Sequence, residues 1–183
     1  MRLAQGRHRR YLLLIVLLAG LFGCARDDVG AYAANHPQLL LKDFFNGELT
    51  AHGIVKNRDG ELIRYFNVSM QARWDEQGQG TLDEHFEFDD GERQRRIWTL
   101  QPQEDGRYLA SANDVSQPVS MRISGNALFM EYVLSLQYQG KPLDVNVKDK
   151  MYLVNPRTII NESQISKFGF TLGSVSLVIQ KLP

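Results

Sequence analysis

The sequence has a single cysteine and no excess of either charge. Its 183 residues include 21 basic and 21 acidic residues, so the formal net charge is zero and gives no electrostatic indication of nucleic-acid binding. Because Cys24 is the only cysteine, an intramolecular disulfide bond and a cysteine-based zinc site are both excluded. The 43% apolar and 23% charged residues are typical of one ordinary globular domain.

Sequence motifs of catalysis are also missing. Three histidines, His36, His52 and His85, follow no H-x-x-H or H-E-x-x-H spacing, and no nucleophile elbow, P-loop or dinucleotide-binding motif occurs. We therefore predict no catalytic residue, no metal site and no cofactor, and expect a protein that is not an enzyme. A lyase or isomerase acting on lipid, with Tyr152, Lys167 or Glu84 as acid or base, stays as the weakest alternative.

The only long apolar run lies at the N-terminus. Arginines precede the run at 11–21, a small residue and Cys24 follow it, and this order is typical of a signal peptide over residues 1–23. At about half of the ~20 residues that span a bilayer, the run is short for a transmembrane anchor. Removing residues 1–23, which hold four arginines and no acid, leaves 17 basic against 21 acidic residues, a net charge of −4.

The four residues at 21–24, Leu-Phe-Gly-Cys, resemble the lipobox of bacterial lipoproteins. The resemblance implies that Cys24 becomes the N-terminus, carries a diacylglyceryl thioether and is acylated, which anchors the protein to a membrane. Because Ala25 rather than aspartate follows the cysteine, it also implies the outer membrane, facing the periplasm. The alternative is a free buried cysteine. Residues 24–41 are expected to form a lipidated N-terminus and tether, with a possible short helix within 32–46.

The rest of the chain alternates apolar and polar residues with the period of β-strands. Phe66, Val68 and Met70 share one strand face, for example, while Tyr65 and Asn67 share the other. Turn signals recur about every ten residues, at 57–60, 77–78, 89–91, 104–106, 124–126 and 139–140. We predict an all-β fold over 42–183, a single antiparallel, lipocalin-like barrel of about 8–10 strands. A two-sheet sandwich would show the same alternation.

Three stretches are similar to a proteobacterial lipoprotein family of unknown function. They lie at 82–98 (Leu-Asp-Glu-His-Phe-Glu-Phe-Asp-Asp-Gly-Glu, then Gln-Arg-Arg-Ile-Trp), at 126–134, and at 149–153 with 160–169. The resemblance implies a calycin-like or lipocalin-like barrel and a lipid context, because related genes often lie near genes for fatty-acid modification. It implies no reaction.

Strand parity places several polar side chains among apolar neighbours. Glu84 shares a face with Leu82 and Phe86, and Arg96 shares one with Trp98. Inside a barrel these charges would pair with each other or meet an anionic ligand head group, because a buried unpaired charge is costly. The alternative is a set of exposed ion pairs across the hairpin. Glu84, Arg96 and Trp98 are therefore candidate ligand-binding residues.

A second group of candidates lies late in the chain. Asp149 shares the face of Val145 and Val147, while Tyr152 points to the other side. Asn161, Ser163 and Lys167 share parity with Ile159 and Ile165 and supply hydrogen-bond donors for a carboxylate or phosphate. Alternatively, they form the solvent face of their strand. The candidates of this group are Asp149, Tyr152, Asn161, Ser163 and Lys167.

These observations favour a membrane-anchored periplasmic lipoprotein whose barrel binds a lipid, such as a fatty acid, or another apolar small molecule. The support is the combination of barrel-like strands, the expected acyl anchor and aromatic-rich faces. The alternative is a structural lipoprotein with a filled barrel whose outer face docks onto an envelope partner.

Overall fold

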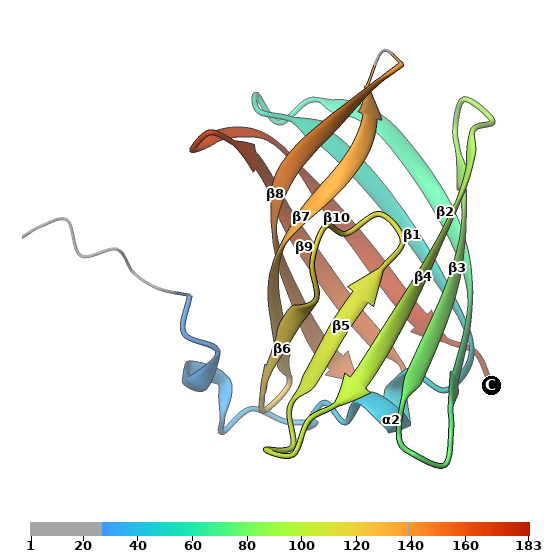
Figure 1. Ribbon diagram of the computed structural model, residues 1–183, viewed down its shortest axis with the longest axis vertical. Coiled ribbons are helices and arrows are strands. Elements are labelled where there is room, and N and C mark those ends of the chain that lie inside the picture. The colour runs from blue at the N-terminus through green and yellow to red at the C-terminus, as the bar shows by residue number, and fades with distance from the viewer. Residues whose placement is uncertain (1–26, 139) are drawn as a thin grey trace, which may run out of the picture.

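Each strand of the structure pairs with the strand that follows it in the chain. The computed structural model describes residues 27–138 and 140–183. Its ten antiparallel strands form a closed barrel (Figure 1). The strands are β1 (Gly47–Asn57), β2 (Leu62–Trp74), β3 (Gly80–Phe88), β4 (Arg93–Pro102), β5 (Tyr108–Ala112), β6 (Val119–Ser124), β7 (Ala127–Tyr138), β8 (Lys141–Asn155), β9 (Thr158–Lys167) and β10 (Phe170–Lys181).

The first and last strands close the barrel. β1 pairs with β10 from Leu49 opposite Lys181 to Asn57 opposite Gly173, so the sheet has no free edge along this seam. The predicted all-β barrel is therefore confirmed, and the two-sheet sandwich is not the structure.

Alternation and turns explain why these residues form these strands. In β2, Phe66, Val68 and Met70 point into the barrel and are buried, whereas Tyr65 is exposed. The turn between β3 and β4 needs the glycine that the sequence supplies, because Gly91 has a φ of +84° and donates its N–H to the carbonyl of Phe88. The turn signals at the other hairpins act in the same way.

A short helix, α2 (Leu41–Phe44), closes one end of the barrel, the lower end in Figure 1. Leu41, Phe44 and Phe45 are buried there, and the indole Nε1 of Trp74 donates to the carbonyl of Phe45 at 2.6 Å. Next to this plug the interior is filled by side chains, among them Leu49, Leu100, Leu128 and Ile159. The predicted helix within 32–46 is thus only four residues long, and the first strand starts after it.

The segment before α2 lies against the barrel wall instead of extending as a free tether. Asp27 accepts a hydrogen bond from Lys150 Nζ at 2.7 Å, and the ring of Tyr32, at the end of the 3₁₀ helix η1 (Val29–Tyr32), lies 5.5 Å from that of Phe129. Gly125 makes the close packing possible, because a Cβ there would stand 1.8 Å from the carbonyl oxygen of Tyr32. Within the described ranges, the structure contains no helix with the length and hydrophobicity of a membrane span.

Candidate functional site

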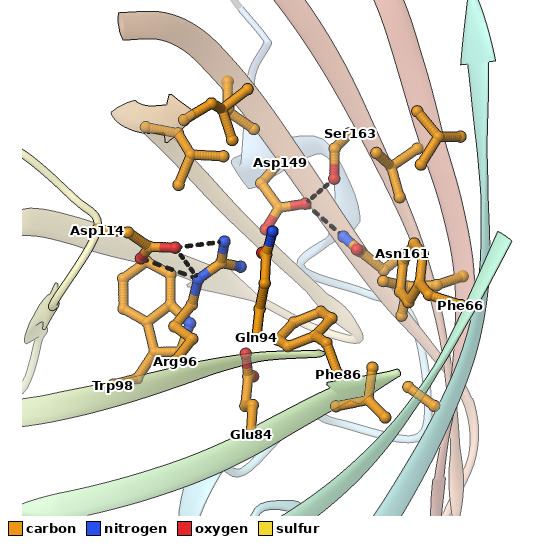
Figure 2. Close-up of a pocket in the computed structure, with 18 of the residues that line it drawn as sticks. Phe66, Glu84, Phe86, Gln94, Arg96, Trp98, Asp114, Asp149, Asn161 and Ser163 are labelled. Carbon is orange, nitrogen blue, oxygen red and sulfur yellow. Dashed lines mark hydrogen bonds and ion pairs between the residues drawn. The ribbon is translucent and has the colours of Figure 1, made fainter. Parts of the chain in front are cut away.

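The half of the barrel away from α2 contains a cavity of about 630 Å³ (Figure 2). Its lining includes Glu92 and Gln137, which lie at the ends of the β3–β4 and β7–β8 hairpins, so the cavity opens at the end opposite the helical plug. Most of the barrel wall is hydrogen-bonded sheet, but β5 and β6 are short, and beside the cavity the segment 113–118 lies between β4 and β7.

Aromatic and aliphatic side chains form most of the cavity wall. The ring of Phe66 lies 5.7 Å from that of Phe86 and 5.5 Å from that of Phe88. Gly53 provides the room for this cluster, because a Cβ at that position would stand 2.3 Å from the Phe66 ring. Further apolar lining comes from Val68, Met70, Met130, Leu134, Leu136, Val147, Met151, Ile165, Val175 and Leu177.

An ion pair crosses the polar side of the cavity. Arg96 of β4 donates its Nε to both carboxylate oxygens of Asp114, at 2.9 and 2.8 Å, and its Nη2 lies 2.7 Å from Oδ2 (Figure 2). The guanidinium also lies 5.3 Å from the centre of the Phe86 ring. Burial opposes the charge of Arg96, but the hydrogen bonds to Asp114 and the nearby Glu84 raise its pKa above the usual value. Arg96 is therefore a fixed cation whose charge Asp114 neutralises.

Glu84 of β3 is a buried carboxyl group that takes no part in this hydrogen-bond network. Its residue is only 9% exposed, yet no hydrogen bond or ion pair joins its carboxyl to another side chain within residues 27–138 and 140–183. Burial raises the pKa of Glu84 to about 7, although the charge of Arg96 acts in the opposite direction. Glu84 therefore changes its charge near neutral pH.

A second carboxyl group, that of Asp149 on β8, lies deep in the same cavity. Its Oδ1 accepts hydrogen bonds from Asn161 Nδ2 at 2.5 Å and from Ser163 Oγ at 2.7 Å, both from β9 (Figure 2). Burial raises the pKa of Asp149, against the effect of these two donors and of Arg96. Burial and the charge of Asp149 also raise the pKa of the phenol of Tyr132.

Six of the eight candidate ligand-binding residues are brought together by the barrel. They all line the cavity: Glu84, Arg96, Trp98, Asp149, Asn161 and Ser163. The expected direct pairing of Glu84 with Arg96 is replaced by the pair of Arg96 with Asp114. The alternative that Asn161 and Ser163 belong to a solvent face does not hold, because they are 3% and 9% exposed on the inner face.

Tyr152 and Lys167 lie outside the cavity. Tyr152 has the opposite parity to Asp149 and faces outward, where its ring is 5.5 Å from Tyr32 and 5.9 Å from Phe129. Lys167 is the last residue of β9, and its Nζ donates to the carbonyl of Asp144 at 2.6 Å, at the rim. Neither residue belongs to the cavity lining. Cys24 lies outside the described residues.

Some cavity residues were not predicted from the sequence. Asp114 lies between β5 and β6, where no strand alternation indicates which way a side chain points. Arg64 lies at the mouth, 3.6 Å from the centre of the Phe88 ring, and its Nη2 is bound to Asp90 and Glu92 at 2.7 and 2.6 Å. Within the described part of the chain, no three His, Cys, Asp or Glu side chains are grouped as they would be around a metal ion.

The fold and the cavity together define an up-and-down β-barrel with an internal site, the architecture that lipocalins use on a smaller number of strands. The chain belongs to the family described as "Protein of unknown function (DUF3833)", whose model matches residues 18–181. No curated protein matches the sequence significantly. The family assignment identifies no catalytic activity.

Several solved structures are similar in fold. A protein of unknown function from the DUF3598 family of Nostoc punctiforme has 14% identity and a TM-score of 0.59, over 81% of this chain and 51% of its own, so this chain spans about half of that protein. Rv2717c from M. tuberculosis has 10% identity and a TM-score of 0.54, over 76% of this chain and 93% of its own. At these identities the similarity shows the fold alone.

Proposed function

We propose that this protein binds a lipid or another apolar small molecule in the barrel, without catalysing a reaction. The observation that carries the proposal is the cavity of about 630 Å³, which is apolar over most of its wall and has a few polar groups on two facing sides, β3–β4 and β8–β9. Small-molecule sites have volumes of roughly 300–1,000 Å³ and this distribution of apolar and polar groups. The alternative, a lipoprotein that docks onto an envelope partner, expects a barrel filled by side chains. Side chains fill the described interior beside α2, whereas the other half contains the cavity.

Narrowing the cavity is expected to weaken the binding of an apolar ligand. Val147 is buried on β8 and lines the cavity, so Val147→Phe places a ring in the ligand volume. Lys148→Phe is the matched control, since the adjacent residue is exposed on the outer face. With dodecanol as probe in isothermal titration calorimetry, we expect Val147→Phe to weaken binding at least tenfold and Lys148→Phe to change it less than twofold. Equal affinity in all three proteins would refute the cavity as the binding site.

We further propose that acylated Cys24 anchors the barrel to a bacterial membrane. The proposed location is the outer membrane, on the side that faces the periplasm. The described residues support a short connection, because Asp27 is already bound to Lys150 of the barrel wall. Two residues lie between Cys24 and Asp27, so the Cα atoms of these two residues are at most about 10 Å apart. The barrel would therefore lie against the bilayer.

Replacing Cys24 with serine is expected to release the protein from the membrane. The thioether cannot form on serine, so the variant should appear in the soluble fraction after a carbonate wash, while the unaltered protein stays in the pellet. Ala25→Ser, at the next residue, is the control and should stay membrane-bound. A Cys24→Ser protein that still sediments with membranes would rule out the anchor.

A further inference from the structure

The polar groups available to a ligand in the cavity are mainly acidic. Glu84 projects from β3 and Asp149 from β8, both are buried on the inner face, and their negative charges raise the pKa of the Tyr132 phenol near them. Arg96 is the cation beside them, and its guanidinium is occupied by Asp114 through three close contacts. The inner surface therefore offers carboxyl oxygens rather than a free positive charge.

Glu84 lacks the partner that a buried carboxyl normally has. It is more than nine-tenths buried and faces the cavity, and its neighbours across the sheet are Met70 of β2 and Arg96 of β4. Among the described residues none donates a hydrogen bond to it. Buried polar groups are almost always hydrogen-bonded, because leaving one unpaired away from water is costly. A ligand with a donor group would supply the missing bond.

Asp149 has a free acceptor as well. Both of its side-chain donors, Asn161 and Ser163, bind the same oxygen, Oδ1. The second oxygen, Oδ2, receives no hydrogen bond from the described residues. The two carboxyl groups thus present acceptor oxygens from opposite walls of one apolar cavity, at β3 and β8.

An anionic head group has no matching site here. A carboxylate such as that of a fatty acid would meet Glu84 and Asp149, and like charges at short range are repulsive. Arg64, a cation at the mouth, binds Asp90 and Glu92 through Nη2, while its buried Nε has no hydrogen-bond partner among the described residues. Lys167 lies at the rim with its ammonium on a backbone carbonyl. The anionic head group considered from the sequence is therefore disfavoured.

We propose that the ligand is an amphiphile whose apolar chain ends in a protonated amine. The ammonium group donates a hydrogen bond to Glu84, the carboxyl group of Asp149 on the opposite wall adds electrostatic attraction, and the chain lies along Phe66, Phe86 and Phe88 toward the mouth. An ammonium supplies three donors and a positive charge, which satisfies the unpaired carboxyl of Glu84 and is attracted by both acids. The inference rests on the proposed binding function and names the class of ligand.

Three probes of equal chain length test the head group: dodecylamine, dodecanol and dodecanoate, each below its micelle concentration at pH 7.5. We expect dodecylamine to bind at least tenfold more tightly than dodecanoate, with dodecanol in between. Glu84→Gln should weaken dodecylamine binding about tenfold and change dodecanol binding less than twofold. Glu87→Gln is the matched control, because Glu87 lies on the same strand with its side chain exposed to solvent.

The outcomes separate this inference from the proposed function. If dodecanol binds but dodecanoate binds as tightly as dodecylamine, the amine preference is wrong while the binding function stands. The same holds if Glu84→Gln folds, as checked by circular dichroism, and leaves dodecylamine affinity unchanged. Asp149→Asn is a second variant, since an amide oxygen still accepts from Asn161 and Ser163, and it should also weaken the amine selectively. If no probe binds, both proposals fail.

Discussion

Replacing Arg96 with methionine is expected to lower the free energy of unfolding by about 3 kcal/mol. Methionine keeps much of the side-chain length but removes the guanidinium, so Asp114 loses its close contacts and Glu84 loses the nearby positive charge. Breaking one half of a buried ion pair typically costs ~3–5 kcal/mol, because the remaining charge is left unpaired. We choose the low end because Asp114 is partly exposed, at 24%. Urea denaturation at pH 7.5 measures the loss.

The neighbouring arginine provides the control. Arg95 lies one residue away with its guanidinium on Asp83 at 2.7 Å, but on the outer face and 56% exposed. Arg95→Met should cost much less than Arg96→Met, because exposed ion pairs are screened by solvent and contribute little to stability. Adding Asp114→Asn to Arg96→Met should recover part of the loss, because it removes the unpaired charge. Equal losses for the two arginine variants would contradict the assignment of the inner pair.

The buried carboxyl of Glu84 is expected to make stability depend on pH. Below about pH 4.5 the carboxyl is protonated in the folded and the unfolded chain, and the effect is absent. As the pH rises toward 7, the unfolded chain loses this proton first, so the folded state becomes less favourable. Above about 7 both states are ionised and the full cost persists. The difference between a pKa of about 7 and one of 4.5 corresponds to about 3 kcal/mol.

Glu84→Gln removes this dependence. Relative to the unaltered protein, the variant should gain free energy of unfolding as the pH rises from 5 to 8.5, by about 2.5 kcal/mol. Denaturation curves at the two pH values measure the gain. Glu87→Gln, whose side chain is exposed, should leave the pH profile unaltered. A Glu84→Gln protein with the same pH dependence as its parent would show that Glu84 is not the group that titrates.

Strand parity predicted much of the cavity because alternation inside a closed barrel is strict. Glu84, Arg96 and Asp149 each have apolar neighbours two residues away, and each points inward in the structure. The same rule indicated that Tyr152 faces the other side. Parity failed only where a strand ends: Lys167 has the right parity, but at the rim its long side chain reaches the backbone of Asp144.

Tertiary contacts that no local pattern encodes could not be predicted. The partner of Arg96 is Asp114, 18 residues later and outside any strand, so a pairing of Arg96 with Glu84 was the nearest inference from the sequence. Residues 27–36 are polar and small, which favours a loose connection, but Tyr32 packs against Phe129 and Gly125 leaves room for its carbonyl. The position of the Phe66 ring depends on Gly53 of β1, where a Cβ would stand 2.3 Å from the ring.

Because β1 pairs with β10, the barrel can close only after its tenth strand has been synthesised. The barrel is completed by pairs such as Leu49 with Lys181, in its first and last strands, so closure depends on the last of the ten strands to be synthesised. Until residues 170–181 have joined, the edges of β1 and β9 stay open and the interior is not enclosed on that side. A ligand can therefore be retained only after the whole domain has been made and has folded, so loading must follow folding.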